Sequence, residues 1–235
     1  MIRSPFATAR ADVADLVLGR RCAVCDQGSG ILCSSCWVAL LAHRPYTPRL
    51  PGLQVVSAWP YQGAGGKVLL AYKERGSRDL VHPLAIALAR CLTVISDQPL
   101  AVIPMPAHQH SITERGFDVV AAIAQQACHM LVRAGHPAWL LPVLAWVGQS
   151  PRQVGRGRRE RLNLASTQFR VCPGVEVSQS PTPTRVVLVD DVVTTGATLR
   201  AARASLSAHG LLASVQATIA ATEAGGYPRS SNQPG

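Results

Sequence analysis

The sequence is poor in acidic residues, in lysine and in aromatic residues. Only 13 of its 235 residues are Asp or Glu, against 23 Lys and Arg, which gives a formal net charge of +10. Just two of these bases are lysines, Lys67 and Lys73. The positive excess favours an anionic partner, such as a phosphorylated metabolite, a nucleotide or a nucleic acid, over a cationic one. A solvated basic surface without a partner is the alternative.

A long apolar run is also missing. The longest candidate, residues 84–95, is shorter than the roughly 20 residues that span a bilayer and is interrupted by Arg90. The N-terminus carries Asp12 and Asp15 and has no continuous apolar stretch, so we expect neither a signal peptide nor membrane insertion. The predicted compartment is the cytoplasm, where thiols stay reduced and the seven cysteines do not form a disulfide framework.

The hydrophobic pattern predicts an α/β fold. The chain is 48% apolar and 15% charged, which supports a sizeable core. Predicted strands alternate with predicted helices, and this order is typical of a parallel sheet of about five strands flanked by helices. The strands are expected at 53–59, 100–105, 139–147, 185–189 and 214–221, and the helices at 65–72, 80–95, 117–134 and 198–209.

Three parts are expected along the chain. The Pro-rich stretch 44–52 indicates a boundary between a small cysteine-containing element at 19–45 and an α/β domain at 53–224. The Gly/Pro/Ser-rich residues 225–235 are predicted to be a disordered tail.

Four cysteines near the N-terminus have the spacing of a metal site. They form two CxxC pairs separated by seven residues, namely Cys22, Cys25, Cys33 and Cys36. Each short turn can present two thiolates to one ion, which favours tetrahedral Zn²⁺. Four thiolates leave no open coordination position, so the predicted zinc is structural. A redox CxxC pair is the weaker alternative, because such motifs usually occur singly.

A second motif combines two acids with a Thr/Gly loop. The β-branched run 185–189 predicts a buried strand, and Asp190 and Asp191 follow at its carboxyl end, where open α/β sheets bind ligands. The next residues are expected to open a helix whose backbone N–H groups enclose a phosphate, while the acids accept hydrogen bonds from sugar hydroxyls. The loop residues are Thr194, Thr195, Gly196, Ala197 and Thr198. A solvated turn with Thr198 as helix N-cap is the alternative.

Residues 186–198 resemble the phosphoribosyl diphosphate (PRPP) signature of type I phosphoribosyltransferases. Over residues 20–222 the chain is similar to the ComF/GntX family, in which a four-cysteine zinc ribbon precedes such a domain. The stretches that carry this similarity, besides the signature, are 22–36, 73–76, 102–117 and 153–163. The resemblance implies the type I phosphoribosyltransferase fold, with Asp190 and Asp191 on the ribose hydroxyls, residues 194–198 on the 5′-phosphate, and Mg²⁺ bound with PRPP.

The resemblance also assigns a diphosphate-binding loop to the segment that follows Val102 and contains Arg115. Family members commonly have Asn-Gln where this chain has Asp118 and Val119, and an Asp there adds negative charge near the expected diphosphate. Residues 152–161 hold five Arg and correspond to a loop that closes over PRPP. Arg115, Arg152 and Arg161 are the catalytic candidates, because guanidinium forks suit a diphosphate leaving group. Alternatively, Arg115 is a surface residue at a helix start, and residues 152–161 form a solvated basic loop or contact a nucleic acid.

The expected function is therefore that of a PRPP-binding phosphoribosyltransferase-like protein. It would transfer phosphoribosyl to an acceptor that the sequence does not identify, and the family resemblance implies a link to competence and DNA uptake. The alternative is a non-catalytic PRPP-sensing or DNA-handling protein that retains the fold.

Overall fold

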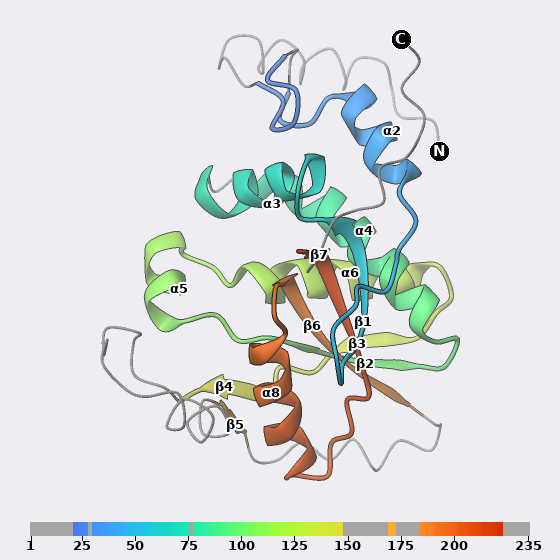
Figure 1. Cartoon of the computed structure of the whole chain (residues 1–235), viewed down its shortest axis with the longest axis vertical. Coiled ribbons are helices and arrows are strands. Elements are labelled where there is room, and N and C mark those ends of the chain that lie inside the picture. The colour runs from blue at the N-terminus through green and yellow to red at the C-terminus, as the bar shows by residue number, and fades with distance from the viewer. Residues whose placement is uncertain (1–20, 28–29, 76–77, 148–168, 173–183, 223–235) are drawn as a thin grey trace.

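The computed structural model describes residues 21–27, 30–75, 78–147, 169–172 and 184–222 (Figure 1). The described helices and strands alternate along most of this length. In chain order they are α2 (Ser34–Ala42), β1 (Gln54–Pro60), α3 (Ala64–Arg75), the short 3-10 helix η1 (Arg78–Leu80), α4 (Val81–Ile95), β2 (Leu100–Pro104), α5 (Gln109–Arg115), α6 (Val119–Arg133), β3 (Ala138–Leu140), β4 (Leu144–Trp146), β5 (Phe169–Val171), β6 (Arg185–Val193), α8 (Ala197–Ser207) and β7 (Val215–Ala221).

The central sheet has five strands in the order β1-β7-β6-β2-β3, and all neighbouring pairs are parallel. This arrangement confirms the predicted parallel sheet of an α/β protein. The strands β4 and β5 form a separate antiparallel pair. β6 lies at the centre because residues 186–189 are all buried, so both of its faces need a cover of apolar side chains.

Helices cover the sheet on both faces and create two hydrophobic cores (Figure 1). One core lies under α3, α4 and α6 and includes Val187 and Val189 of β6. The other lies under α8 and the β4-β5 pair and includes Val186 and Leu188 of the same strand. Alternate residues of β6 therefore face different helices, as the period of two in a β-strand requires.

Two predicted segments differ from the structure. The strand expected at 139–147 is divided into β3 and β4, which belong to different sheets, with Pro142 between them. Proline has no N–H group to donate to a ladder, so the chain leaves the parallel sheet there. The polar segment 107–115, for which no helix was predicted, contains the short helix α5.

The Pro-rich stretch 44–52 packs against the domain that it precedes. Tyr46 forms an isolated antiparallel bridge with Ser57 of β1, and Leu50 is buried in the core beneath α8. Residues 19–20, the segment 148–168 and the predicted tail at 225–235 lie outside the described residues. Among the described helices, none combines the length and the apolar character that a membrane crossing requires.

Candidate functional site

The carboxyl ends of β2 and β6 form a topological switch point. The strand that follows β2 in sequence within this sheet is β3, which lies on one side, whereas β7, which follows β6, lies on the other side. The connections leaving β2 and β6 therefore diverge, and open α/β sheets bind ligands at such a point, which we call the crevice. Pairing between the two strands ends at Pro104 and Val189, so residues 190–193 of β6 border this crevice.

The two acids of the motif lie on β6 directly beyond that last pair. Adjacent strand residues face opposite sides of a sheet, so Asp190 continues the row of Leu188 and Asp191 the row of Val189. On the α3 side, the ammonium Nζ of Lys73 donates to Oδ2 of Asp191 at 2.6 Å. The side chains of this pair are 27% and 16% exposed, respectively, so the ion pair is largely shielded from water.

Asp190 has a different environment from its neighbour. Burial raises the pKa of the Asp190 carboxyl well above its ordinary value, and the nearby charge of Asp191 is the second cause of this shift. It is paired in register with Thr218 of β7, which in turn is paired with Ser57 of β1. The Thr218 hydroxyl is buried and makes no hydrogen bond within the described part of the chain. A buried polar row thus crosses three strands next to the crevice.

The Thr/Gly loop joins β6 to α8 as the sequence predicts. Gly196 is the N-cap of α8 and has a left-handed backbone with φ of 74°. A Cβ atom there would collide with Leu53, so the position requires glycine for its conformation and for its packing. The side chains of Thr194, Thr195 and Thr198 are exposed beside the amino end of the helix. Because Gly196 is the N-cap, Thr198 lies within α8 and is not its N-cap.

Arg200 holds this loop to the chain that precedes β1. Its guanidinium donates to the carbonyl of Thr195 at 2.7 Å and to the carbonyl of Pro51 at 2.5 Å. Both bonds end on backbone oxygens, so Arg200 does not occupy the exposed hydroxyls or the N–H groups of the loop. The amide of Ala197 makes one long contact, at 3.4 Å, with the hydroxyl oxygen of Thr195.

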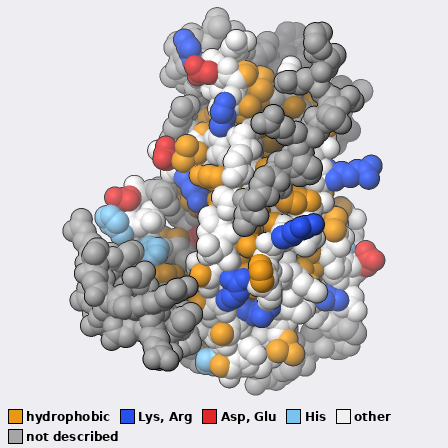
Figure 2. All heavy atoms as spheres, in the orientation of Figure 1, with side chains coloured by type: hydrophobic (Ala, Val, Ile, Leu, Met, Phe, Trp, Pro, Cys, Tyr) orange, Lys and Arg blue, Asp and Glu red, His pale blue; other side chains and the backbone are white. Residues whose placement is uncertain are grey.

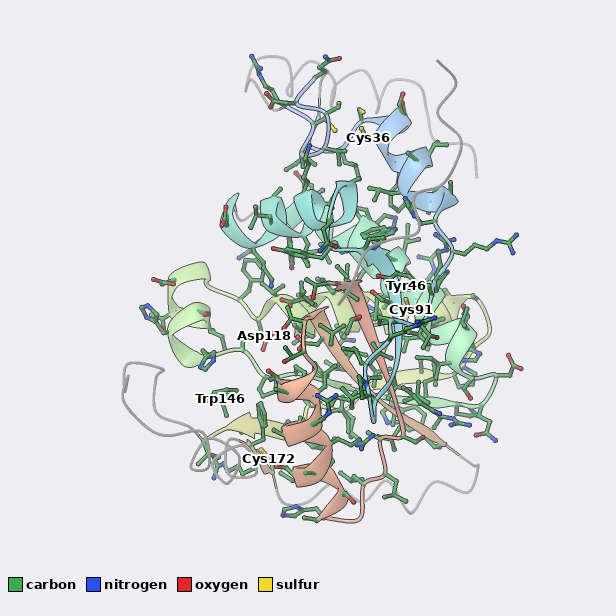
Figure 3. All side chains as sticks on the ribbon, in the orientation of Figure 1. Cys36, Tyr46, Cys91, Asp118, Trp146 and Cys172 are labelled. Carbon is green, nitrogen blue, oxygen red and sulfur yellow. The ribbon has the colours of Figure 1, made fainter. Side chains whose placement is uncertain are left out.

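Asp118 stabilises the opposite wall of the crevice. Its carboxylate accepts hydrogen bonds from the backbone N–H of Ala121 at 3.0 Å and of Ala107 at 3.2 Å. It is the N-cap of α6 and also ties down the segment that follows β2 (Figure 3). Asp at this position thus has a structural role, and its charge is partly balanced by two N–H dipoles.

Of the three catalytic candidates, the structure describes only the backbone of one. Arg115 is the last residue of α5, and the side chain of this residue lies outside what the structure describes. Arg152 and Arg161 fall in the segment 148–168, also outside the described residues. The structure therefore brings together residues 190–191 and 194–198 and does not test the three arginines.

The sequence did not identify Tyr72 and Lys73 of α3 as site residues. Tyr72 is fully buried and its ring lies 5.6 Å from the ring of Phe117, between centroids. Burial raises the pKa of Tyr72 to about 12, and its hydroxyl makes no hydrogen bond within the described residues. The sequence signals for Lys73 were that it is one of two lysines in the chain and that it begins the stretch 73–76, which carries part of the family resemblance.

The four N-terminal cysteines converge as predicted. The sulfurs of Cys22, Cys25, Cys33 and Cys36 all lie within 4.8 Å of one another, and none is in a disulfide. A tetrahedral Zn²⁺ ion about 2.3 Å from each sulfur places the sulfurs about 3.8 Å apart. The distance between the sulfurs of Cys25 and Cys33 is 3.8 Å. The four side chains therefore fit a zinc ion.

The described part of the cysteine element, residues 21–27 and 30–42, packs against α3 and the end of β1 (Figure 3). Lys67 donates its ammonium to the carbonyl of Val24 at 3.0 Å. The indole N–H of the buried Trp59 donates to the carbonyl of Leu40, at the end of α2, also at 3.0 Å. The apolar side chains of Ile31, Leu32 and Trp37 cover the same core.

Comparisons with known proteins found no match. No protein-family model matches the chain, and no curated protein matches it.

Proposed function

We propose that the crevice between β2 and β6 binds PRPP, or a closely related ribose phosphate. The observation that carries this proposal is the position of one motif: two acids and a Thr/Gly helix start lie in sequence at the carboxyl edge of the central strand, at the switch point. A phosphate fits the amino end of α8, since backbone N–H groups and the helix dipole favour an anion there. The ribose hydroxyls then donate to Asp190 and Asp191.

Mg²⁺ would accompany the diphosphate. The described residues offer no group of three acid, His or Cys ligands outside the cysteine element. Asp191 is engaged by Lys73, and Asp190 is held on the other face of β6. Diphosphate oxygens and waters would therefore supply most of the coordination, as is common for Mg²⁺ bound with phosphorylated substrates.

The proposed reaction is the transfer of phosphoribosyl from PRPP to an acceptor. The bond between C1 of the ribose and the diphosphate oxygen breaks, positive charge develops at C1, and the acceptor supplies the electron pair of the new bond. The acids hold the ribose, and Arg115, Arg152 and Arg161 are proposed to stabilise the departing diphosphate.

Calorimetry with PRPP and Mg²⁺ tests the binding step. We expect wild-type protein to bind PRPP and the Asp191→Asn variant to bind it roughly tenfold more weakly, because hydrogen bonds to charged groups contribute about 1.5–3 kcal/mol. Asp97→Asn, an exposed acid at the far end of β2, is the matched control. Absence of binding by the wild type would remove the proposal.

The second candidate is a non-catalytic protein that senses PRPP or handles DNA in competence. The net charge of +10 supports it, and Lys and Arg side chains are distributed over the face seen in Figure 2, which carries few acidic ones. A screen of acceptors that follows diphosphate release separates the two candidates. DNA binding measured at several salt concentrations should then weaken steeply with salt. Alanine at Arg156, Arg158 and Arg159 should lower that slope if these residues contact phosphates.

For the cysteine element we propose one structural zinc ion held by four thiolates. It would fix the fold of a segment too small to build its own core. The apolar contact of this element with α3 also makes it part of the support of the crevice.

A further inference from the structure

The end of α3 contacts both walls of the crevice. Tyr72 packs on Phe117, which belongs to the segment between β2 and α6, and its neighbour Lys73 pairs with Asp191 on β6. These two consecutive residues therefore place an ammonium group between the segment that follows β2 and the acids of β6. Arg78, another cation of this region, lies over the Phe117 ring, 5.3 Å from its centroid.

The ammonium has bonding capacity beyond its ion pair. A lysine carries three N–H donors, and the bond to Asp191 uses one of them. The side chain is 27% exposed, so the remaining donors can reach a ligand without a rearrangement of α3. Lys73 can thus hold Asp191 and an anionic oxygen at the same time.

The charges of the crevice favour such a group. Asp118, Asp190 and Asp191 all border it, and Asp190 senses the charge of both other acids. Lys73 is the one Lys or Arg that forms a salt bridge with any of these three acids in the described part of the chain. The carboxylates in this group repel an anion unless cations such as Lys73 and Mg²⁺ offset them.

The position of Lys73 also indicates which anionic group it meets. The proposed 5′-phosphate site is the amino end of α8, and α8 covers the face of the sheet that Asp190 and Leu188 share. Lys73 reaches Asp191 from the opposite face, where α3 and α6 lie, next to the segment after β2. A ligand anchored by its 5′-phosphate therefore presents a second anionic group, on the other side of the ribose, to Lys73.

We propose that Lys73 is a specificity-determining residue that favours ribose phosphates with a diphosphate at C1 over ribose 5-phosphate. This inference rests on the proposed function of the crevice. Lys73 contacts the diphosphate directly while it holds Asp191 in place for the ribose.

The test is calorimetric titration of PRPP and of ribose 5-phosphate, each with Mg²⁺, into wild-type protein and Lys73 variants. Lys73→Met removes the charge, Lys73→Gln removes the charge but retains an N–H donor for Asp191, and Lys73→Arg retains the charge. We expect the Met and Gln variants to lose tenfold or more in PRPP affinity but less than threefold in ribose 5-phosphate affinity. Lys73→Arg should lie closer to wild type. Lys67→Met, a change of the other lysine of α3, is the matched control and should bind both ligands as wild type does.

The outcomes separate the two proposals. Equal losses for both ligands would mean that Lys73 acts only through Asp191, and an unchanged PRPP affinity would mean that it does not act on the ligand; either result overturns the inference but leaves the proposed function standing. A wild-type protein that binds neither ligand overturns the proposed function and the inference together. Thermal melting and zinc content of each variant show whether it is folded, and two neutral substitutions provide a second variant if one fails to fold.

Discussion

The ammonium of Lys67 donates a hydrogen bond to the carbonyl of Val24, 3.0 Å away and 43 residues earlier in the chain. Six residues further along the same helix, Lys73 pairs with Asp191. The only two lysines of the protein therefore connect α3 to its two candidate sites, the cysteine element and the crevice. Both candidate sites therefore contact the same helix.

Zinc removal should destabilise the cysteine element and the packing of α3. We expect freshly purified protein to contain about one zinc per chain, and Cys33→Ser to lose the ion and to melt at a lower temperature, because structural zinc supplies folding free energy. Elemental analysis and thermal melting give the measurement. Cys172→Ser, which changes a cysteine far from the cluster, should keep its zinc. Zinc-free wild-type protein, purified without chelator, would contradict the assignment.

Loss of the Asp118 carboxylate should loosen the segment that follows β2. Asp118→Ala removes the N-cap of α6 and the bond to Ala107, and we expect it to cost about 0.5–2 kcal/mol in the free energy of unfolding. Asp118→Asn retains one acceptor oxygen and should cost less. Denaturant unfolding measures both variants, and equal stability of wild type and Asp118→Ala would show that the cap contributes nothing.

Asp190→Asn should make the protein more stable and its ligand binding weaker. The pKa of Asp190 is raised to about 8, mainly by burial and next by the charge of Asp191, with Lys73 acting in the opposite direction. The folded state therefore holds this proton more tightly than the unfolded state does. Between the ordinary carboxyl range and about pH 8, the stability of the wild type falls as pH rises.

The Asn variant lacks this dependence. At pH 8 it should melt at least about 3 °C above wild type, which corresponds to roughly 1 kcal/mol for a domain of this size. The difference should shrink as the pH is lowered toward 4. Melting curves across this range provide the measurement, and a constant difference at all pH values would argue against a raised pKa. We also expect this variant to bind PRPP more weakly, because the wild-type acid contributes to ligand binding although it lowers the stability of the folded protein.

Gly196→Ala should disturb the loop more than a matched change at another left-handed glycine. Gly196 and Gly210 have φ values of 74° and 76°, but only at Gly196 does an added Cβ meet another side chain, that of Leu53. Both changes carry the backbone strain of an L-residue in this conformation, on the order of 1 kcal/mol. We expect Gly196→Ala to be the less stable variant and the only one with weakened PRPP binding. Equal effects in both assays would exclude a special role for the loop.

Elements with a local signal could be predicted from the amino-acid sequence. The buried run at 185–189 predicted the central strand, which extends to Val193 in the structure. The paired CxxC spacing predicted a cluster because each pair is brought together by a turn of only four residues. The acids and the Thr/Gly loop are contiguous, so their common position at one strand end followed from the strand alone.

The tertiary structure decided what depends on contacts between distant segments. Only the strand order shows that β2 and β6 are neighbours whose connections diverge. Only the packing of α3 shows that Lys73 reaches Asp191, 118 positions later in the chain, and that the two adjacent acids have different surroundings. The capping role of Asp118 depends on Ala107 lying beside it, because a local pattern cannot specify which distant backbone N–H groups a carboxylate meets.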